Sequence, residues 1–128
     1  MNKHPISPNT SGASSDAPPP PLHLPERLKP EIFHLPVDKM REGYYSDKYF
    51  VRTREVLQNS GRDPVVTMQV FQKKKAIVAG TDEAIAILKL CLTSGYEFDE
   101  LEVRSLRDGD EVQPWDTVMH ITGPYGSY

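Results

Sequence analysis

The chain has 128 residues with 15 basic and 18 acidic side chains, so its formal net charge is −3. This length allows one domain, but not a small domain joined to a full α/β barrel of about 200 residues or more, and the acidic balance argues against nucleic-acid binding. No apolar run approaches the roughly 18 residues of a membrane-spanning helix, no signal peptide is recognisable, and the single cysteine excludes an intrachain disulfide, so we expect a cytoplasmic protein without a membrane partner.

Residues 1–36 hold nine of the twelve prolines. The segment Met1–Leu24 has too little apolar surface to offset its ordering entropy, so it is predicted to be a disordered tail. Its run Pro18–Pro21 favours a short polyproline II piece, for which an SH3-type ligand role is the functional alternative to plain solvation. Residues Pro25–Pro36 are interpreted as a transition whose Ile32, Phe33 and Leu35 can attach it to the domain.

The folded domain is predicted over residues 37–128. Its first helix is expected over Asp47–Asn59, with Ser46 or Asp47 as the N-cap and Gly61 as the stop. Apolar residues at three- and four-residue spacing predict one buried face on this helix. That face consists of Tyr49, Phe50, Thr53, Val56 and Leu57.

Alternating β-branched residues predict a strand over Val65–Gln72, and Lys73–Lys75 read as a charged turn before a short strand over Ala76–Ala79. The two strands are expected to pair as a hairpin. A second helix is predicted over Asp82–Thr93, with Thr81 as its N-cap. Cys91 is placed on the apolar face of that helix, as a small hydrophobic residue.

The last third of the chain predicts strands over Glu100–Leu106 and Thr117–Thr122, with a tight turn at Asp108–Asp110. Trp115 falls in the connection, and His120 is expected to be a partly buried structural histidine. A helix, a hairpin, a helix and further strands indicate the α+β class, not a regular βαβ series.

Three segments in this order resemble the N-terminal domain of nicotinate phosphoribosyltransferases, which are similar in fold to quinolinate phosphoribosyltransferases. The segments are Gly43–Thr53, Val66–Phe71 and Asp108 to Tyr125. The resemblance covers about residues 36–128. It implies the N-terminal α/β-sandwich domain of a type II phosphoribosyltransferase, without the catalytic barrel domain that follows it in the family.

The resemblance also implies an activity for the full-length enzyme. Family members transfer the phosphoribosyl group of phosphoribosyl pyrophosphate to the ring nitrogen of nicotinate, giving nicotinate mononucleotide for NAD synthesis. Mg²⁺ and commonly ATP take part, and the enzymes usually form homodimers with active sites shared between subunits. Because the barrel supplies most of the chemistry, we expect the 128-residue chain alone to be inactive, as a fragment or truncated product, with no catalytic residue and no cofactor of its own.

Three residues are carried over as candidate substrate-binding residues. Asp47-Lys48-Tyr49 is similar to the Asp-x-Tyr motif of the family, which implies that Tyr49 stacks on the pyridine ring across the dimer. Arg52 and Arg54 follow it, and a guanidinium binds a carboxylate or a phosphate through two parallel hydrogen bonds. Without the resemblance, Tyr49 reads as a core aromatic residue and both arginines as surface charges.

Other patterns in the sequence give no site. No Cys-x-x-Cys or His-x-x-x-His spacing predicts a metal site, and Gly123–Gly126 lacks the lysine of a P-loop. The acidic residues between Glu97 and Glu111 and the lysines Lys73–Lys75 are interpreted as solvated surface.

Three alternative functions stay open. The chain fits a fragment of a quinolinate phosphoribosyltransferase, which decarboxylates its product and has no ATP step. The Gly-Asp turn with the strand after it resembles biotinyl or lipoyl carrier domains, but no lysine follows Lys89 to carry the cofactor. An isolated domain could also serve assembly or regulation by pairing with a full-length enzyme.

Overall fold

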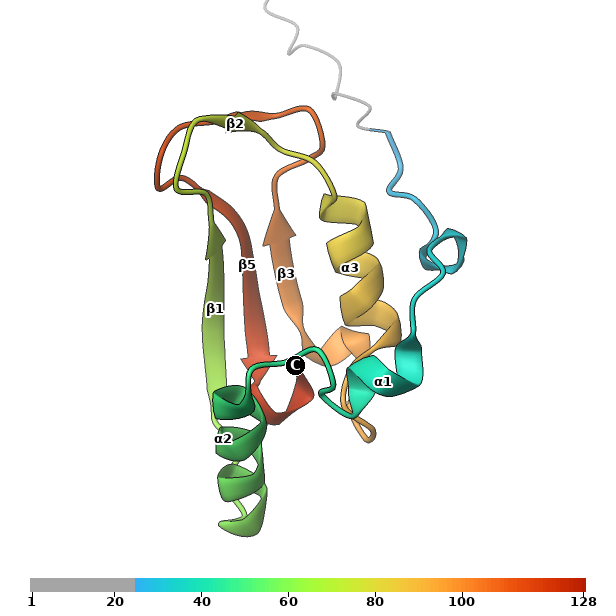
Figure 1. Cartoon of the computed structure of the whole chain (residues 1–128), viewed down its shortest axis with the longest axis vertical. Coiled ribbons are helices and arrows are strands. Elements are labelled where there is room, and N and C mark those ends of the chain that lie inside the picture. The colour runs from blue at the N-terminus through green and yellow to red at the C-terminus, as the bar shows by residue number, and fades with distance from the viewer. Residues whose placement is uncertain (1–24) are drawn as a thin grey trace, which may run out of the picture.

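The structure, a computed structural model, describes residues 25–128. The described residues contain the helices α1 (Val37–Arg41), α2 (Lys48–Asn59) and α3 (Thr81–Leu90). They also contain the short 3₁₀ turns η1 (Pro30–Ile32), η2 (Phe98–Glu100) and η3 (Tyr125–Ser127). The strands are β1 (Val65–Phe71), β2 (Ala76–Ile77), β3 (Glu102–Ser105), β4 (Glu111–Val112) and β5 (Thr117–Pro124). Figure 1 shows a sheet with α3 laid along it and α2 projecting beyond its lower end. The described residues form one α+β domain and contain no barrel.

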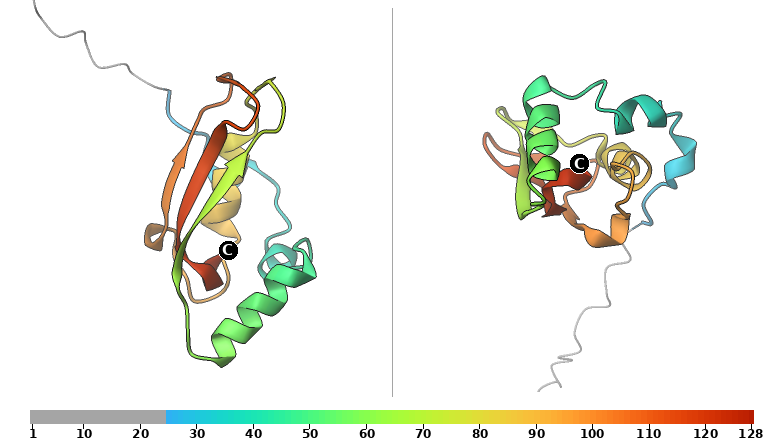
Figure 2. Two further views of the ribbon diagram at one scale, coloured as in Figure 1. Left: turned by 90° about the vertical axis from the view of Figure 1, so that its left-hand side faces the viewer. Right: turned by 90° about the horizontal axis from the view of Figure 1, so that it is seen from below.

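A three-stranded antiparallel sheet in the order β1-β5-β3 is the centre of the domain. Residues of β5 alternate between the two faces, so Met119, Ile121 and Gly123 are buried while His120 is exposed. α3 covers the buried face (Figure 2). The expectation of a partly buried His120 is therefore wrong, because its side chain points to the face that no helix of residues 25–128 covers.

The hydrophobic core lies between α3 and the sheet. Its buried members are Ile85, Leu88, Leu92, Leu101, Met119 and Ile121. Each fully buried aliphatic side chain of this kind contributes about 1.5–3 kcal/mol relative to an exposed one. Ile85 and Leu88, three residues apart in α3, account for the side that the helix presents to the sheet, and Leu92 follows just after its end.

The prediction that the first two strands of the chain pair with each other as a hairpin is wrong. β1 pairs with β5, from Val65 opposite Pro124 to Phe71 opposite Thr117, and the short β2 pairs with β4. The lysine turn thus joins two different sheets. The alternating pattern identified both strands, but the partner of each lies far away in the sequence.

The start of α3 is fixed by a residue that lies 27 positions further along the chain. Gly80, at φ 86°, is the N-cap in place of the expected Thr81, and Thr81 is the first helical residue. The carboxylate of Asp108 accepts hydrogen bonds from the backbone N–H groups of Gly80 and Thr81, both at 2.8 Å, and from the Thr81 hydroxyl at 2.6 Å. These bonds, that of the Thr81 hydroxyl foremost, lower the pKa of Asp108.

Arg27 attaches the N-terminal segment to the domain. Its guanidinium donates to Asp82 Oδ1 at 2.7 Å, to Ser105 Oγ at 2.8 Å and to the Leu106 carbonyl at 3.1 Å. The bond from Arg27 is the main reason why the pKa of Asp82 is lowered. Residues 25–36 therefore follow the outer side of α3.

Cys91 lies just after α3 and not on its apolar stripe, which corrects the sequence expectation. It is half-buried beside α1, with its Sγ 3.6 Å from Met40 Sδ, and burial raises the pKa of its thiol. No helix within residues 25–128 is long and apolar enough to cross a membrane.

Candidate functional site

The loop before α2 and the first turn of that helix are fixed by local contacts. Gly43 has φ 79°, and a Cβ at that position would lie 3.0 Å from a methyl group of Val51, so glycine is required there. Asp47 caps α2, as the sequence predicts, because its Oδ1 accepts the Tyr49 N–H at 2.8 Å. The cap sets the rotation of the helix, and thereby the direction in which its side chains point.

Tyr49 and Arg52 share the outer face of α2. Together with Thr53, Val56 and Leu57 they line a surface hollow of about 420 Å³. The Tyr49 side chain is 69% exposed, so the buried helix face expected from the sequence is wrong for this chain. The rings of Tyr49 and Phe50 are 5.6 Å apart in an edge-to-face arrangement.

Arg54 points the other way. It lines a second hollow of about 360 Å³ between α2, Met68 of the sheet and Tyr128, and its Nη1 donates to Thr93 Oγ1 at 3.0 Å. The structure therefore brings together two of the three candidate residues, Tyr49 and Arg52. Arg54 is a link between α2 and the rest of the domain.

A second link, centred on Asp63, holds the connection that follows α2. Its Oδ2 accepts the Tyr96 hydroxyl at 2.5 Å, and its Oδ1 accepts the Gly126 N–H at 2.8 Å. The hydrogen bond to Asp63 is the main cause that raises the pKa of Tyr96 to about 12, so this hydroxyl stays protonated and keeps donating at neutral pH. No sequence pattern predicts this link, because its three members are far apart along the chain.

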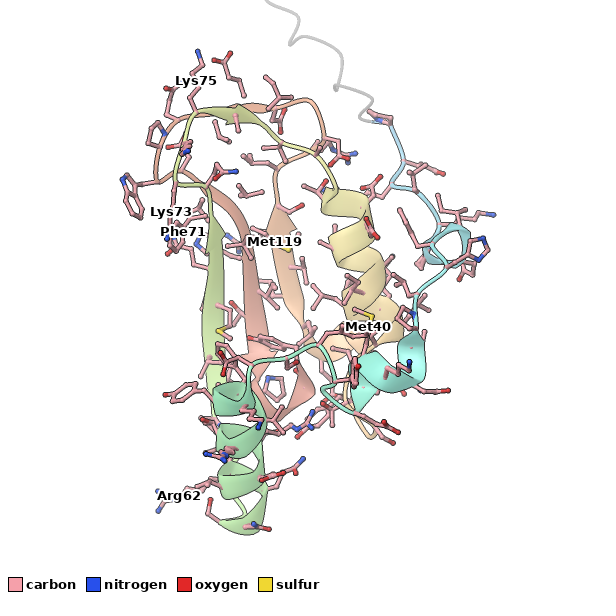
Figure 3. All side chains as sticks on the ribbon, in the orientation of Figure 1. Met40, Arg62, Phe71, Lys73, Lys75 and Met119 are labelled. Carbon is pink, nitrogen blue, oxygen red and sulfur yellow. The ribbon has the colours of Figure 1, made fainter. Side chains whose placement is uncertain are left out.

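Among residues 25–128, Arg52 is the charged side chain that lines the hollow on α2. No group of three or more His, Cys, Asp or Glu residues within residues 25–128 could hold a metal ion. The lysines of the β1–β2 turn are remote. Figure 3 shows Phe71, Lys73 and Lys75 together at one end of the molecule, while Arg62, just after α2, lies at the other end. The hollow therefore offers an aromatic face, a guanidinium and aliphatic walls, and no reacting group.

Comparison with known families identifies this domain. Residues 47–128 match the sequence profile of the family described as quinolinate phosphoribosyl transferase, N-terminal domain. The chain belongs to this family. The match begins at Asp47, the cap of α2, and includes the whole sheet and α3.

A solved structure agrees with this assignment. The domain is similar to nicotinate-nucleotide pyrophosphorylase from Pyrococcus furiosus, with a TM-score of 0.55, 21% identity and coverage of 74% of this chain and 24% of that one. At this identity the likeness concerns the fold. The chain spans about a quarter of the length of that enzyme, and no curated protein matches it.

Proposed function

We propose that this chain forms the N-terminal part of a phosphoribosyltransferase of NAD synthesis, in which the outer face of α2 is a wall of the pyridine-binding site. The observation that carries the proposal is the pairing of an exposed Tyr49 with Arg52 on one hollow, within a domain of the quinolinate phosphoribosyltransferase family. A monomeric domain has no structural need to keep such a face open.

The chemistry of the hollow suits a flat aromatic acid. An electron-poor pyridine ring can stack on the exposed face of Tyr49, and such aromatic pairs add about 0.5–1.5 kcal/mol beyond the area they bury. Arg52 lies one helical turn further on, where its guanidinium can bind a ring carboxylate through two hydrogen bonds. The Thr53 hydroxyl already donates to the Tyr49 carbonyl at 2.8 Å, so its proton is used within the helix. Tyr49 and Arg52 are then the polar side chains that can bind the ligand.

The number of cations favours nicotinate over quinolinate. Nicotinate carries one carboxylate and quinolinate two, and within residues 25–128 Arg52 is the cationic side chain that lines this hollow. Arg54 faces the opposite side and is bonded to Thr93. On this basis we assign nicotinate, with nicotinate mononucleotide as the product.

Quinolinate is the second candidate. The description of the matching family favours it, since that family is named for quinolinate phosphoribosyl transfer. A second cation for the extra carboxylate is available in Lys48, which lines an adjoining hollow together with Arg52.

The remaining groups of the reaction lie elsewhere in a complete enzyme. Phosphoribosyl transfer needs a phosphate cradle and groups that stabilise a ribose centre with developing positive charge. The described residues contain no carboxylate cluster for the Mg²⁺ that accompanies pyrophosphate, so its binding does not fit this domain. We propose that these groups, and any coupling to ATP, belong to a barrel in a homodimer, and that the isolated chain is inactive.

A fusion enzyme tests the proposal. This chain would replace the matching quarter of the Pyrococcus furiosus enzyme, and formation of the mononucleotide from phosphoribosyl pyrophosphate would be followed separately with nicotinate and with quinolinate. We expect turnover by the fusion, none by the isolated chain, and a loss with Tyr49→Ala that Tyr49→Phe largely restores. A soluble fusion that turns over neither pyridine, or one indifferent to Tyr49→Ala, would contradict the proposal.

A further inference from the structure

The strand β1 lies at an edge of the three-stranded sheet. It pairs with β5 on one side, and no strand of residues 25–128 pairs with it on the other. Figure 1 shows β1 at the left border of the sheet, and the left panel of Figure 2, seen from that side, shows the strand uncovered. An edge strand presents a row of unpaired backbone N–H and C=O groups, which can pair with a further strand.

The hydrogen bonds of β1 show which of its residues face outward. In an antiparallel pair, residues alternate between those that bond to the neighbouring strand and those that face away from it. The Tyr125 N–H donates to the Pro64 carbonyl at 3.0 Å, and the register continues from there without a shift as far as Val70. The even-numbered residues therefore bond to β5. The backbone groups of the odd-numbered residues, Thr67 and Gln69 among them, face the open edge and find no backbone partner in the described part of the chain.

This edge has little of the protection that exposed strands usually carry. Proteins protect such edges with charged side chains, prolines or bulges, or keep the edge strand very short. β1 is seven residues long and contains no charged residue and no proline, and its register shifts only at its end, between Val70 and Phe71. Val65 and Val70 are 70% and 47% exposed, and a further strand would cover both.

The sequence of β1 is complementary to itself. Val-Val-Thr-Met-Gln-Val-Phe has the same order of apolar and polar residues in both directions, with Met68 at its centre. Two copies can therefore pair antiparallel about a two-fold axis at Met68. The residues that then lie opposite each other are Val65 and Phe71, Val66 and Val70, and Thr67 and Gln69. Apolar side chains face apolar ones, polar face polar, and no like charges meet.

The backbone favours the same register. Thr67 and Gln69 both have their N–H and C=O groups at the open edge, so when they lie opposite each other they can exchange two N–H···O bonds. A shift by one residue would place outward-facing groups opposite groups that already bond to β5, and would move every side chain to the other face. A shift by two residues would place Val65 opposite Gln69, or Thr67 opposite Phe71. The register about Met68 is thus the one that satisfies backbone and side chains together.

We propose that the open edge of β1 binds β1 of a second copy of this chain, so that two domains share one six-stranded antiparallel sheet. The exposed Val65 then packs on Phe71 of the second copy, and Val66 covers Val70. Because the contact is one short strand wide, the dimer is weak and depends on concentration. It uses no residue of the hollow on α2, so it is independent of the proposed pyridine-binding face.

Charged substitutions at the centre of β1 test the dimer and its register. Thr67→Lys and Gln69→Glu each place two like charges diagonally across the two-fold axis, and both side chains are exposed, so the domain should still fold. In sedimentation equilibrium of the full chain, from about 10 μM to about 1 mM, we expect a dimer whose Kd each substitution raises about fivefold. An equimolar mixture of the two variants should regain the original affinity, because the new ammonium then lies opposite the new carboxylate.

Ser94, exposed in the loop after α3, provides the matched control. Ser94→Lys and Ser94→Glu should leave the Kd unchanged. A full chain that stays monomeric at about 1 mM would overturn the proposal. A mixture of the two β1 variants that associates no better than either variant alone would overturn the register.

Amide hydrogen exchange of the unchanged chain locates the contact. The N–H groups of Thr67 and Gln69 should become protected as the concentration rises, whereas that of Met68, bonded to β5, should be protected at every concentration. Dimerisation without protection of Thr67 and Gln69 would overturn the pairing of the edges. Protection of these two amides that does not change on dilution would overturn the second copy in favour of a segment of the same chain outside residues 25–128.

Discussion

Gly123 of the central strand is a position where one methyl group should destabilise the domain. A Cβ added there would lie 2.3 Å from Leu101 Cδ2 and 3.3 Å from the Glu100 carbonyl oxygen. Leu101 is a buried member of the core, so its side chain cannot simply turn to solvent. Extra methylene groups forced into a packed core cost about 1–3 kcal/mol, which we expect for Gly123→Ala.

Thermal and urea unfolding would measure this cost. For a domain of this size, a loss of about 1–3 kcal/mol lowers Tm by roughly 5–20 °C. The matched background is Leu101→Val, which withdraws the methyl group that the new Cβ would meet. In that background Gly123→Ala should cost clearly less. An unchanged Tm for Gly123→Ala, or the same loss in both backgrounds, would refute the packing argument.

Three other links of the fold can be tested in the same way. Asp108→Asn should lose about 1 kcal/mol by weakening the cap of α3. Because the native pKa of Asp108 is lowered, the wild-type advantage should be full above about pH 4 and fade as the pH falls through that lowered pKa, in urea unfolding followed against pH. Arg27→Lys should free residues 25–36, seen as faster backbone hydrogen exchange there, since one ammonium cannot replace the guanidinium bonds to Asp82, Ser105 and Leu106. Tyr96 should titrate near pH 12 in an ultraviolet titration, and Asp63→Asn should return its pKa toward the ordinary value.

The local elements of the fold could be predicted from the sequence, and their partners could not. Asp47 as the cap of α2 and the strand beginning at Val65 follow from short-range patterns. The pairing of β1 with β5 depends on residues some fifty positions apart, and Asp108 binds the start of α3 from 27 positions further along the chain. The periodicity of apolar residues predicts local structure and says nothing about partners that are distant in the sequence. For this reason the hairpin was predicted wrongly.

The candidate site was half predictable. Residues 49, 52, 53 and 56 follow the three- and four-residue spacing of one helix face, which the structure shows. The spacing identified the residues that share this face of α2. Their apolar character suggested that the face is buried, but no element within residues 25–128 covers it. Arg54 is two positions from Arg52, a spacing that places side chains on different sides of a helix, so its separation was readable from the sequence.

The claim that the outer face of α2 binds a pyridine acid can be measured directly on the isolated chain. Nicotinate would be titrated into the ¹⁵N-labelled protein, with benzene as a ring lacking the carboxylate and Lys73→Gln, in the turn after β1, as a charge control far from the hollow. We predict saturable shifts centred on Tyr49 and Arg52, abolished by Tyr49→Ala, retained by Tyr49→Phe and weakened by Arg52→Gln. Shifts confined to other surfaces, or shifts at α2 that survive Tyr49→Ala, would contradict the account.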